Sequence, residues 1–361
     1  MFLKIDCYGK YRYFHPSPNQ YTKAMDAHAM YQEMLRPSDA LISEMARVEG
    51  DIMILGAGGK MGPSLTVLAR QAADAAGVKK NIIAVARFSE AGLQADLEAQ
   101  GIRTIALDLL NDEQLQQLPD VKNILYLAGT KFGTTGKESF TWAMNSYLPG
   151  RIAEKFKRSR IVVFSTGNVY PLKPVDSGGA IENDVPEPIG EYAQSCLGRE
   201  RVFQYFSSLN NTPTLIYRLN YAIDVTYGVL LDIAKAVREG KPIDLRMGYV
   251  NVIWQGEANE FALRCLAHCS VPPKILNITG PNTASVRQIA IAFGKLFGKE
   301  PVFENHEEKT ALLSNASESY RLFGPQKVGI DQMIAVISKW VQSGGKILGK
   351  PTHFQEREGK F

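Results

Sequence analysis

Cysteine and long hydrophobic runs are both scarce in this sequence, and their scarcity narrows what the protein can be. Only four of its 361 residues are cysteine, too few for a disulfide framework to hold a chain of this size together. The sequence contains no run of about 18 uncharged apolar residues, and the opening MFLKIDCYGK lacks the apolar core of a signal peptide. We therefore expect a cytoplasmic protein that does not associate with membranes.

A strong charge of either sign is also missing. The chain has 41 basic and 37 acidic residues and a net charge of +4, and its basic residues do not cluster with aromatic ones. This bias is too weak to favour nucleic acid or an acidic membrane surface. Apolar residues make up 45% of the chain and charged residues 22%, as in an ordinary globular protein with ample core. A small molecule is the expected partner.

Residues 1–49 are predicted to be an N-terminal extension. The first thirty contain many aromatic residues without regular spacing, and after Pro37 the residues Ser38 and Asp39 are placed to cap a helix through ALISEMARV. The sequence leaves open whether this extension packs on the main body, packs on a partner subunit or is partly disordered.

From Asp51 onward, apolar runs and helical patterns alternate. The runs DIMIL, NIIAVA, TIAL, NILYLA, RIVVFS and TLIYRL are short and rich in branched side chains, which is typical of parallel strands buried on both faces. Because strand-helix-strand units are right-handed, this order predicts an α/β protein with a doubly wound parallel sheet, the Rossmann fold.

Beyond Leu219 the alternation loosens, and four helical patterns are separated only by the short runs ILNITG and PVFE. This change predicts a smaller mixed α/β substrate domain. We expect a nucleotide-binding domain at 50–220 with a return segment at about 246–262, a substrate domain at 221–245 and 263–350, and a tail at 351–361.

A glycine-rich stretch, GAGGKMGP, directly follows the first predicted strand and opens the first helix. Glycines 56, 59 and 62 allow a tight turn, a close approach of a pyrophosphate to the backbone and tight seating of the helix. Its position between a strand and a helix favours a dinucleotide cofactor over a glycine-rich turn without a ligand.

The end of the second predicted strand bears on the choice of cofactor. An acid is expected there for the ribose hydroxyl of NAD, but the sequence reads Ala86-Arg87-Phe88-Ser89. Arg87 and Ser89 suit a ribose phosphate, so NADP is favoured over NAD, with an exposed strand end as the alternative for Arg87. Asp108 ends the third strand, where this architecture meets the adenine ring.

These motifs resemble the extended short-chain dehydrogenase/reductase family of sugar epimerases and dehydratases over about residues 50–345. The resemblance rests on the glycine motif, LAGTK (127–131), Asn145 in AMNSYLPG, FSTGNVYP (164–171), ENDVPEPIGEYAQS (182–195) and LNITGP (276–281). It implies that Tyr192 exchanges a proton with the substrate, that Thr166, or failing it Ser165, holds the reacting oxygen, and that Lys131 lies beside the cofactor. It further implies cofactor contacts from Gly56, Gly58, Gly59, Lys60, Met61, Gly62, Leu109, Leu127, Ala128, Gly129, Asn145, Tyr192 and position 196.

One letter departs from the family's Tyr-x-x-x-Lys motif, because Cys196 stands where the lysine belongs. That lysine lowers the pKa of the tyrosine and binds the nicotinamide ribose, and a thiol does neither. Lys131, slightly favoured, or Arg199, one helical turn beyond Cys196, is predicted to replace its charge. A thiolate role for Cys196 is the less favoured alternative to a small buried filler.

The sequence thus predicts an NAD(P)-dependent oxidoreductase or epimerase acting on a hydroxyl or ketone of a carbohydrate-like molecule, with a cofactor-binding regulator or partner subunit as the alternative. The region 306–324 lacks the diphosphate-binding arginine motif of nucleotide-sugar enzymes, which favours a free sugar or sugar acid. The resemblance also implies a homodimer. We expect no metal site, although Cys265, His268 and Cys269 share one helix face and could be read as three ligands.

Overall fold

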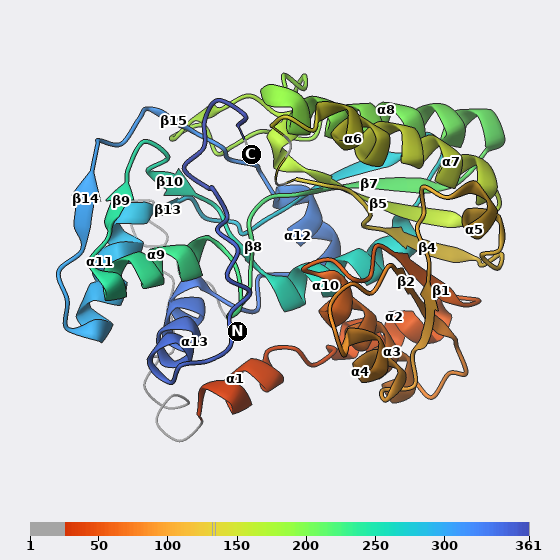
Figure 1. Cartoon of the computed structure of the whole chain (residues 1–361), viewed down its shortest axis with the longest axis horizontal. Coiled ribbons are helices and arrows are strands. Elements are labelled where there is room, and N and C mark those ends of the chain that lie inside the picture. The colour runs from red at the N-terminus through yellow and green to blue at the C-terminus, as the bar shows by residue number, and fades with distance from the viewer. Residues whose placement is uncertain (1–25, 132, 134, 361) are drawn as a thin grey trace, which may run out of the picture.

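The computed structural model describes residues 26–131, 133 and 135–360. Its central feature is a seven-stranded parallel sheet in the order β3-β2-β1-β4-β5-β7-β12 (Figure 1). The strands are β1 (Ile52–Leu55), β2 (Ile82–Ala86), β3 (Arg103–Ala106), β4 (Asn123–Tyr126), β5 (Arg160–Thr166), β7 (Thr214–Leu219) and β12 (Lys274–Ile278). The reversal of order at β1 and β4 confirms the predicted doubly wound fold, and it places a crevice at the carboxyl ends of these strands.

Two layers of helices cover the sheet. One face packs against α2 (Asp39–Arg47), α3 (Gly62–Ala75), α4 (Leu93–Glu98) and α10 (Gln255–Arg264). The other packs against α5 (Asp112–Gln116), α6 (Glu138–Trp142), a π-helix η1 (Ala143–Tyr147), α7 (Leu148–Lys155) and α8 (Gly190–Asn210). All four residues of β1 and all five of β2 are buried, which is why these runs lack polar alternation.

A smaller mixed lobe has its own apolar core. Its helices are α9 (Val229–Glu239), α11 (Val286–Phe297) and α13 (Ile330–Gln342). Short strands complete it in two-stranded pairs: β8 (Ala222–Ile223) with β11 (Ile253–Trp254), β9 (Pro242–Asp244) with β14 (Val302–Glu304), β10 (Tyr249–Val250) with β13 (Ala284–Ser285), and β6 (Lys173–Pro174) with β15 (Thr310–Ala311). The 3-10 turn η2 (Gly167–Val169) follows β5, and the 3-10 turn η3 (Cys265–His268) follows α10.

The expected division between the lobes differs from the structure at several elements, including β12 and α12 (Ser317–Phe323). β12, expected in the substrate domain, is the edge strand of the large sheet, and α12 packs beside it. Leu276 and Ile278 of β12 enter the core of the large lobe, whereas Asn277 bonds to Tyr170 and to the carbonyl oxygen of Ala180. A strand with a buried amide carries too weak an apolar signal to be assigned to a sheet from its sequence.

The described part of the N-terminal extension packs on the main body. Ser38 caps α2 as predicted, accepting a hydrogen bond from the backbone N–H of Leu41 at 3.2 Å. Helix α1 (Ala27–Glu33) packs against α13, so the extension bridges the two lobes. The aromatic residues before position 26 lie outside the described residues. Within the described chain, the helices are all too short or too polar to cross a membrane.

Candidate functional site

The glycine-rich loop turns between β1 and α3. Gly56 has a φ of +92°, and a side chain there would bring its Cβ to 2.7 Å from the backbone nitrogen of Ala128. A Cβ on Gly62 would collide with the carbonyl oxygen of Ala57. The loop therefore packs backbone against backbone and leaves the N-terminus of α3 facing the crevice, as a pyrophosphate requires.

Beside this loop lies a cavity of about 230 Å³ at the carboxyl ends of β1 to β4. Asp108 is held at its edge, because its backbone N–H donates to Gln114 at 2.7 Å and its Oδ1 accepts from Leu110 at 3.0 Å. The predicted cofactor residues that line the cavity are Gly56, Gly58, Gly59, Arg87, Ser89, Asp108, Leu109, Leu127, Ala128 and Gly129.

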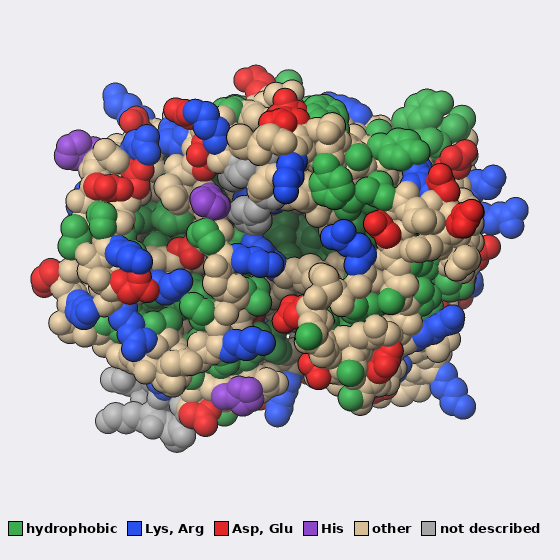
Figure 2. Space-filling model, viewed as in Figure 1, with side chains coloured by type: hydrophobic (Ala, Val, Ile, Leu, Met, Phe, Trp, Pro, Cys, Tyr) green, Lys and Arg blue, Asp and Glu red, His purple; other side chains and the backbone are tan. Residues whose placement is uncertain are grey.

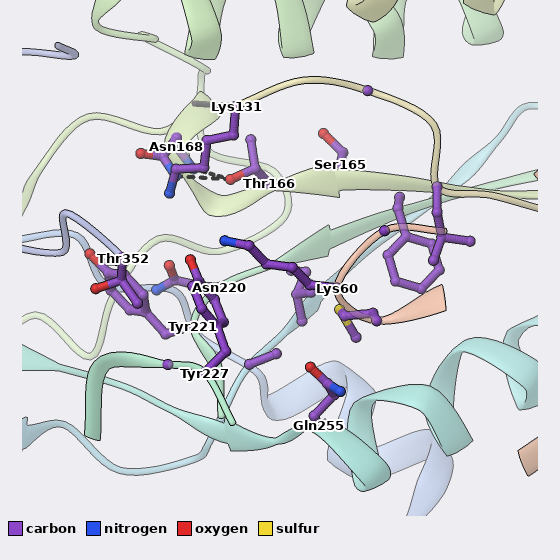
Figure 3. Close-up of a pocket in the computed structure, with 18 of the residues that line it drawn as sticks. Lys60, Lys131, Ser165, Thr166, Asn168, Asn220, Tyr221, Tyr227, Gln255 and Thr352 are labelled. Atoms are coloured by element: carbon purple, nitrogen blue, oxygen red, sulfur yellow. Dashed lines mark hydrogen bonds between the residues drawn. The ribbon is translucent and has the colours of Figure 1, made fainter. Parts of the chain in front are cut away.

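A second cavity, of about 370 Å³, continues from the first between the two lobes. Four residues line both cavities: Gly56, Gly59, Leu127 and Gly129. Predicted residues that line the second are Lys60, Met61, Gly62, Lys131, Ser165, Thr166 and Tyr192 (Figure 3). Figure 2 shows a hollow near the middle of this face with several basic side chains around it. The two connected cavities thus offer one elongated site.

Tyr192 and Thr166 meet at the wall of the second cavity, from α8 and from the end of β5. Thr166 Oγ1 accepts hydrogen bonds from the backbone and side chain of Asn168 at 3.1 and 2.9 Å. Burial, together with Cys196, raises the pKa of Tyr192 well above its ordinary value, whereas Arg199 and a hydrogen bond with Thr166 oppose this rise. Tyr192 is therefore held as a phenol, with Arg199 as the cation that favours its ionisation.

Cys196 and Arg199 lie behind Tyr192 and line neither cavity. Cys196 is fully buried among Val169, Tyr170 and Ala180. Burial raises the pKa of its thiol, the opposite of what a thiolate nucleophile needs.

Arg199 is held in place by acceptors on two elements. Its guanidinium donates to the carbonyl oxygen of Phe164 and to Asn145 Oδ1, each at 2.7 Å. Asn145 in turn bonds to both the N–H and the carbonyl of Thr130, so it supports the loop before Lys131 without lining a cavity. The buried charge of Arg199 is therefore fixed next to the tyrosine.

Ser165 also lines the second cavity, but its hydroxyl is directed into the protein. It donates to the buried carboxylate of Glu200 at 2.6 Å. Glu200 is paired with the buried Arg218 at 2.7 Å, and this ion pair ties α8 to β7. Thr166 is the residue of the two whose hydroxyl is hydrogen-bonded to Tyr192 and Asn168.

Two lysines enter the second cavity from different loops (Figure 3). The ammonium group of Lys60, from the glycine-rich loop, lies 3.4 Å from the centre of the Tyr227 ring. The ammonium group of Lys131, from the loop after β4, lies 5.5 Å from the centre of the Tyr192 ring. Burial lowers the pKa of Lys60 to about 7, with a contribution from Lys131, and lowers that of Lys131 to about 8.

The structure adds residues to this wall that sequence reasoning missed. They are polar or aromatic side chains from the smaller lobe and its junctions: Asn168, Asn220, Tyr221, Tyr227, Gln255 and Thr352. Asn168 lies inside the FSTGNVYP motif and could have been predicted from the sequence. The others come from segments without a periodic pattern or motif, which gave no signal.

Thr352 reaches the cavity because the C-terminal tail crosses the molecule. Its N–H and hydroxyl both donate to Asp232 of α9 at 2.7 Å. Further along, Arg357 donates to the carbonyl oxygen of Thr310, and Gly359 packs against Gly190 at the start of α8. The tail therefore joins the smaller lobe to the helix that carries Tyr192.

The three residues that could be read as metal ligands do not form a site. Cys265 is buried in the core of the large lobe, and His268 packs its ring 5.5 Å from that of Phe323. Among residues 26–131, 133 and 135–360, the structure contains no cluster of three or more acidic, histidine or cysteine residues arranged to hold a metal.

Comparisons with known proteins establish the fold. No protein-family model and no curated protein matches the sequence. A UDP-glucose 4-epimerase from Thermotoga maritima, solved with UDP-glucose, is 14% identical over 81% of this chain and 99% of its own, with a TM-score of 0.67. A UDP-glucuronic acid 4-epimerase from Bacillus cereus, solved with NAD, is 19% identical over 81% and 97%, also at 0.67. A UDP-glucose 4-epimerase from Thermus thermophilus, solved with NAD, is 16% identical over 81% and 99%, at 0.65.

Proposed function

We propose that this protein is an NAD(P)-dependent oxidoreductase or epimerase that acts on a hydroxyl or ketone of a small carbohydrate-like molecule. The observation that carries the proposal is the continuity of the two cavities. The glycine-rich loop, in which Gly56 and Gly62 leave no room for a side chain, lies where the two cavities join, and Tyr192 and Thr166 line the second cavity. The nicotinamide of a bound dinucleotide would supply or accept the hydride.

The protein's own residues supply the proton and the charge. Tyr192 would give its phenolic proton to a ketone oxygen, or take one from a hydroxyl, while Thr166 holds that oxygen by a hydrogen bond. Arg199 would replace the motif lysine electrostatically, because it is the cation that lowers the pKa of Tyr192. This role differs from the slight preference for Lys131 drawn from the sequence.

The residues of the first cavity fit the adenosine half of the dinucleotide. Arg87 and Ser89 are exposed at its rim, where a ribose phosphate would contact them, and this supports NADP. Two of the structural neighbours described above were solved with NAD, so NAD is the alternative.

A free sugar or sugar acid is the proposed substrate, although the solved neighbours bind UDP-sugars. The region 306–324 forms β15 and α12, and Glu307 within it pairs with Arg287 at 2.7 Å. An acidic residue in that arrangement does not favour a diphosphate. We also propose a homodimer, since Tyr147, Tyr205 and Leu209 are exposed on η1 and α8, where hydrophobic side chains gather at the upper right of Figure 2.

A Tyr192→Phe variant tests the proposed chemistry. The wild-type protein should oxidise NADPH or NADH in the presence of a ketose or keto sugar acid, with D-fructose, D-tagatose, D-fructuronate and D-tagaturonate as the panel. The variant should bind the dinucleotide normally, and its turnover should be slower by at least about 100-fold, as expected for loss of a general acid. Unchanged turnover in the variant would refute the role of Tyr192.

A cofactor-binding regulator without catalysis is the second candidate. The observation in its favour is the net rise in the pKa of Tyr192, which the cation at Arg199 does not overcome. Dinucleotide binding without hydride transfer to any member of the panel would favour this reading.

A further inference from the structure

We propose that Lys60 and Lys131 form a site for the anionic group of the substrate, which makes the substrate a sugar acid and not a neutral sugar. This inference rests on the proposed function for the position of the reacting carbon, but the anion site itself is a matter of binding. Both lysines line the second cavity, and Figure 3 shows their side chains entering the same space from different loops.

The lining of this cavity has an unusual charge balance. Its described residues include two lysines and no aspartate or glutamate. Two half-buried ammonium groups in one cavity repel each other, because the charge of Lys131 acts on Lys60. An anion between them would turn this repulsion into two charge-assisted hydrogen bonds, which are among the strongest in proteins.

The orientation of the Lys60 side chain favours binding of a substrate anion over binding of the cofactor phosphates. Lys60 belongs to the loop that faces a pyrophosphate, yet its ammonium group lies over the ring of Tyr227, which comes from the smaller lobe. Lys60 lines the second cavity, not the adenosine-side cavity. It therefore extends from the cofactor loop toward the space between the lobes.

The remaining polar wall suits a polyol. Asn168, Asn220 and Gln255 line the cavity, where their amide nitrogens donate to Thr166, Asn251 and Ser64, and Thr352 closes it from the tail. Neutral amides and hydroxyls match sugar hydroxyls, and they leave a full negative charge to the lysines. An acid group at one end and several hydroxyls along the chain are the features of a sugar acid.

The affinity for the anion should depend on pH. The pKa of Lys60 is about 7 and that of Lys131 about 8, so both are charged below pH 7 and lose their charge as the pH rises. Besides Lys131, the groups that act on Lys60 are Lys350, which lowers its pKa, and Asp232, which raises it. Cys196 raises that of Lys131. Anion binding should therefore weaken as the pH rises from about 7 to about 8. Because a bound anion raises the pKa of both lysines, the loss of affinity should extend to a somewhat higher pH.

Matched probes test the site by calorimetry, without relying on turnover. D-fructuronate and D-fructose differ by a carboxylate in place of a hydroxymethyl group, and D-tagaturonate and D-tagatose form a second pair. Titrations are made into the dinucleotide-loaded full-length protein and into its Tyr192→Phe variant. The variant keeps both lysines, and its slow turnover should not disturb the binding measurement. At pH 6.5, at least one acid should bind at least about tenfold more tightly than its neutral partner. At pH 9 this ratio of affinities should be smaller.

Variants then assign the preference to the lysines. Lys60→Met and Lys131→Met should each remove most of it and leave the affinity for the neutral ketose and for NADPH within about twofold. Lys60→Arg should retain it, and Lys79→Met, at an exposed lysine beyond α3, should change nothing. Equal binding of acid and ketose, or failure of both acids to bind, would overturn the proposal. Loss of NADPH affinity with an unchanged acid preference would instead assign the lysines to the cofactor phosphates.

Discussion

Replacing Arg199 by methionine should raise the pKa at which Tyr192 becomes active. Arg199 is only 6% exposed, and it is the cation that favours ionisation of the buried phenol. A nearby opposite charge lowers a pKa by about 1 to 3. In the direction that oxidises a hydroxyl, Tyr192 must accept a proton, so the rising limb of the pH–rate profile should move up by about that amount in Arg199→Met.

The same substitution should weaken the fold by a predictable amount. Arg199 donates two hydrogen bonds of 2.7 Å, to Phe164 and to Asn145. Hydrogen bonds to charged groups contribute about 1.5–3 kcal/mol each, so the free energy of unfolding should fall by about 3–6 kcal/mol, less what the methionine side chain recovers by packing. Urea denaturation measures this loss without any substrate.

Three further variants separate charge from damage to the fold. Arg199→Lys keeps the charge and should retain most of the wild-type pH profile. Arg264→Met removes an arginine of similar burial that donates to the carbonyl oxygen of Phe323, so it should destabilise the protein without moving the profile. A profile that moves in Lys131→Met and stays fixed in Arg199→Met would refute our account of the missing lysine.

Other substitutions test the surroundings of the site. Glu200→Gln should cost about 3–5 kcal/mol of unfolding free energy by urea denaturation, because it leaves the charge of Arg218 buried without its partner; a loss below about 1 kcal/mol would contradict this. Cys196→Lys should destabilise the protein by about 1–3 kcal/mol through overpacking alone, and it should transfer hydride no faster than the wild type; a variant faster than the wild type would show that a lysine at this position still contributes to catalysis. Arg87→Ala should weaken NADPH binding about tenfold in fluorescence titrations and spare NADH, and equal effects on both would argue against a ribose-phosphate contact.

The large sheet was predictable because most of its strands consist almost entirely of apolar residues. Runs such as those of β1 and β2 are buried on both faces and bordered by turns, so their pattern reports their environment directly. β12 was not assigned to the large sheet because Asn277 interrupts its apolar pattern. The hydrogen bonds of that amide with Tyr170 and Ala180 form only in the folded molecule.

The site was predictable only where a local motif determines it. Glycine spacing indicated the loop, since the positive φ of Gly56 and the contact of Gly62 with Ala57 are features of the local backbone. The direction of Lys60 was not predictable, because Tyr227 lies far along the chain in the other lobe. Helical spacing placed Arg199 one turn beyond Cys196, but only the fold shows the acceptors that hold its charge behind Tyr192.

A crystal structure with NADPH or NADH bound would test the central claim most directly. We predict the adenosine beside Asp108 and Arg87, the pyrophosphate at the loop of Gly56 to Gly62, and the nicotinamide in the second cavity next to the hydroxyl of Tyr192. Lys60 and Lys131 should line the space beyond the nicotinamide. A dinucleotide whose nicotinamide lies outside that cavity, or a protein that binds neither cofactor, would contradict the account.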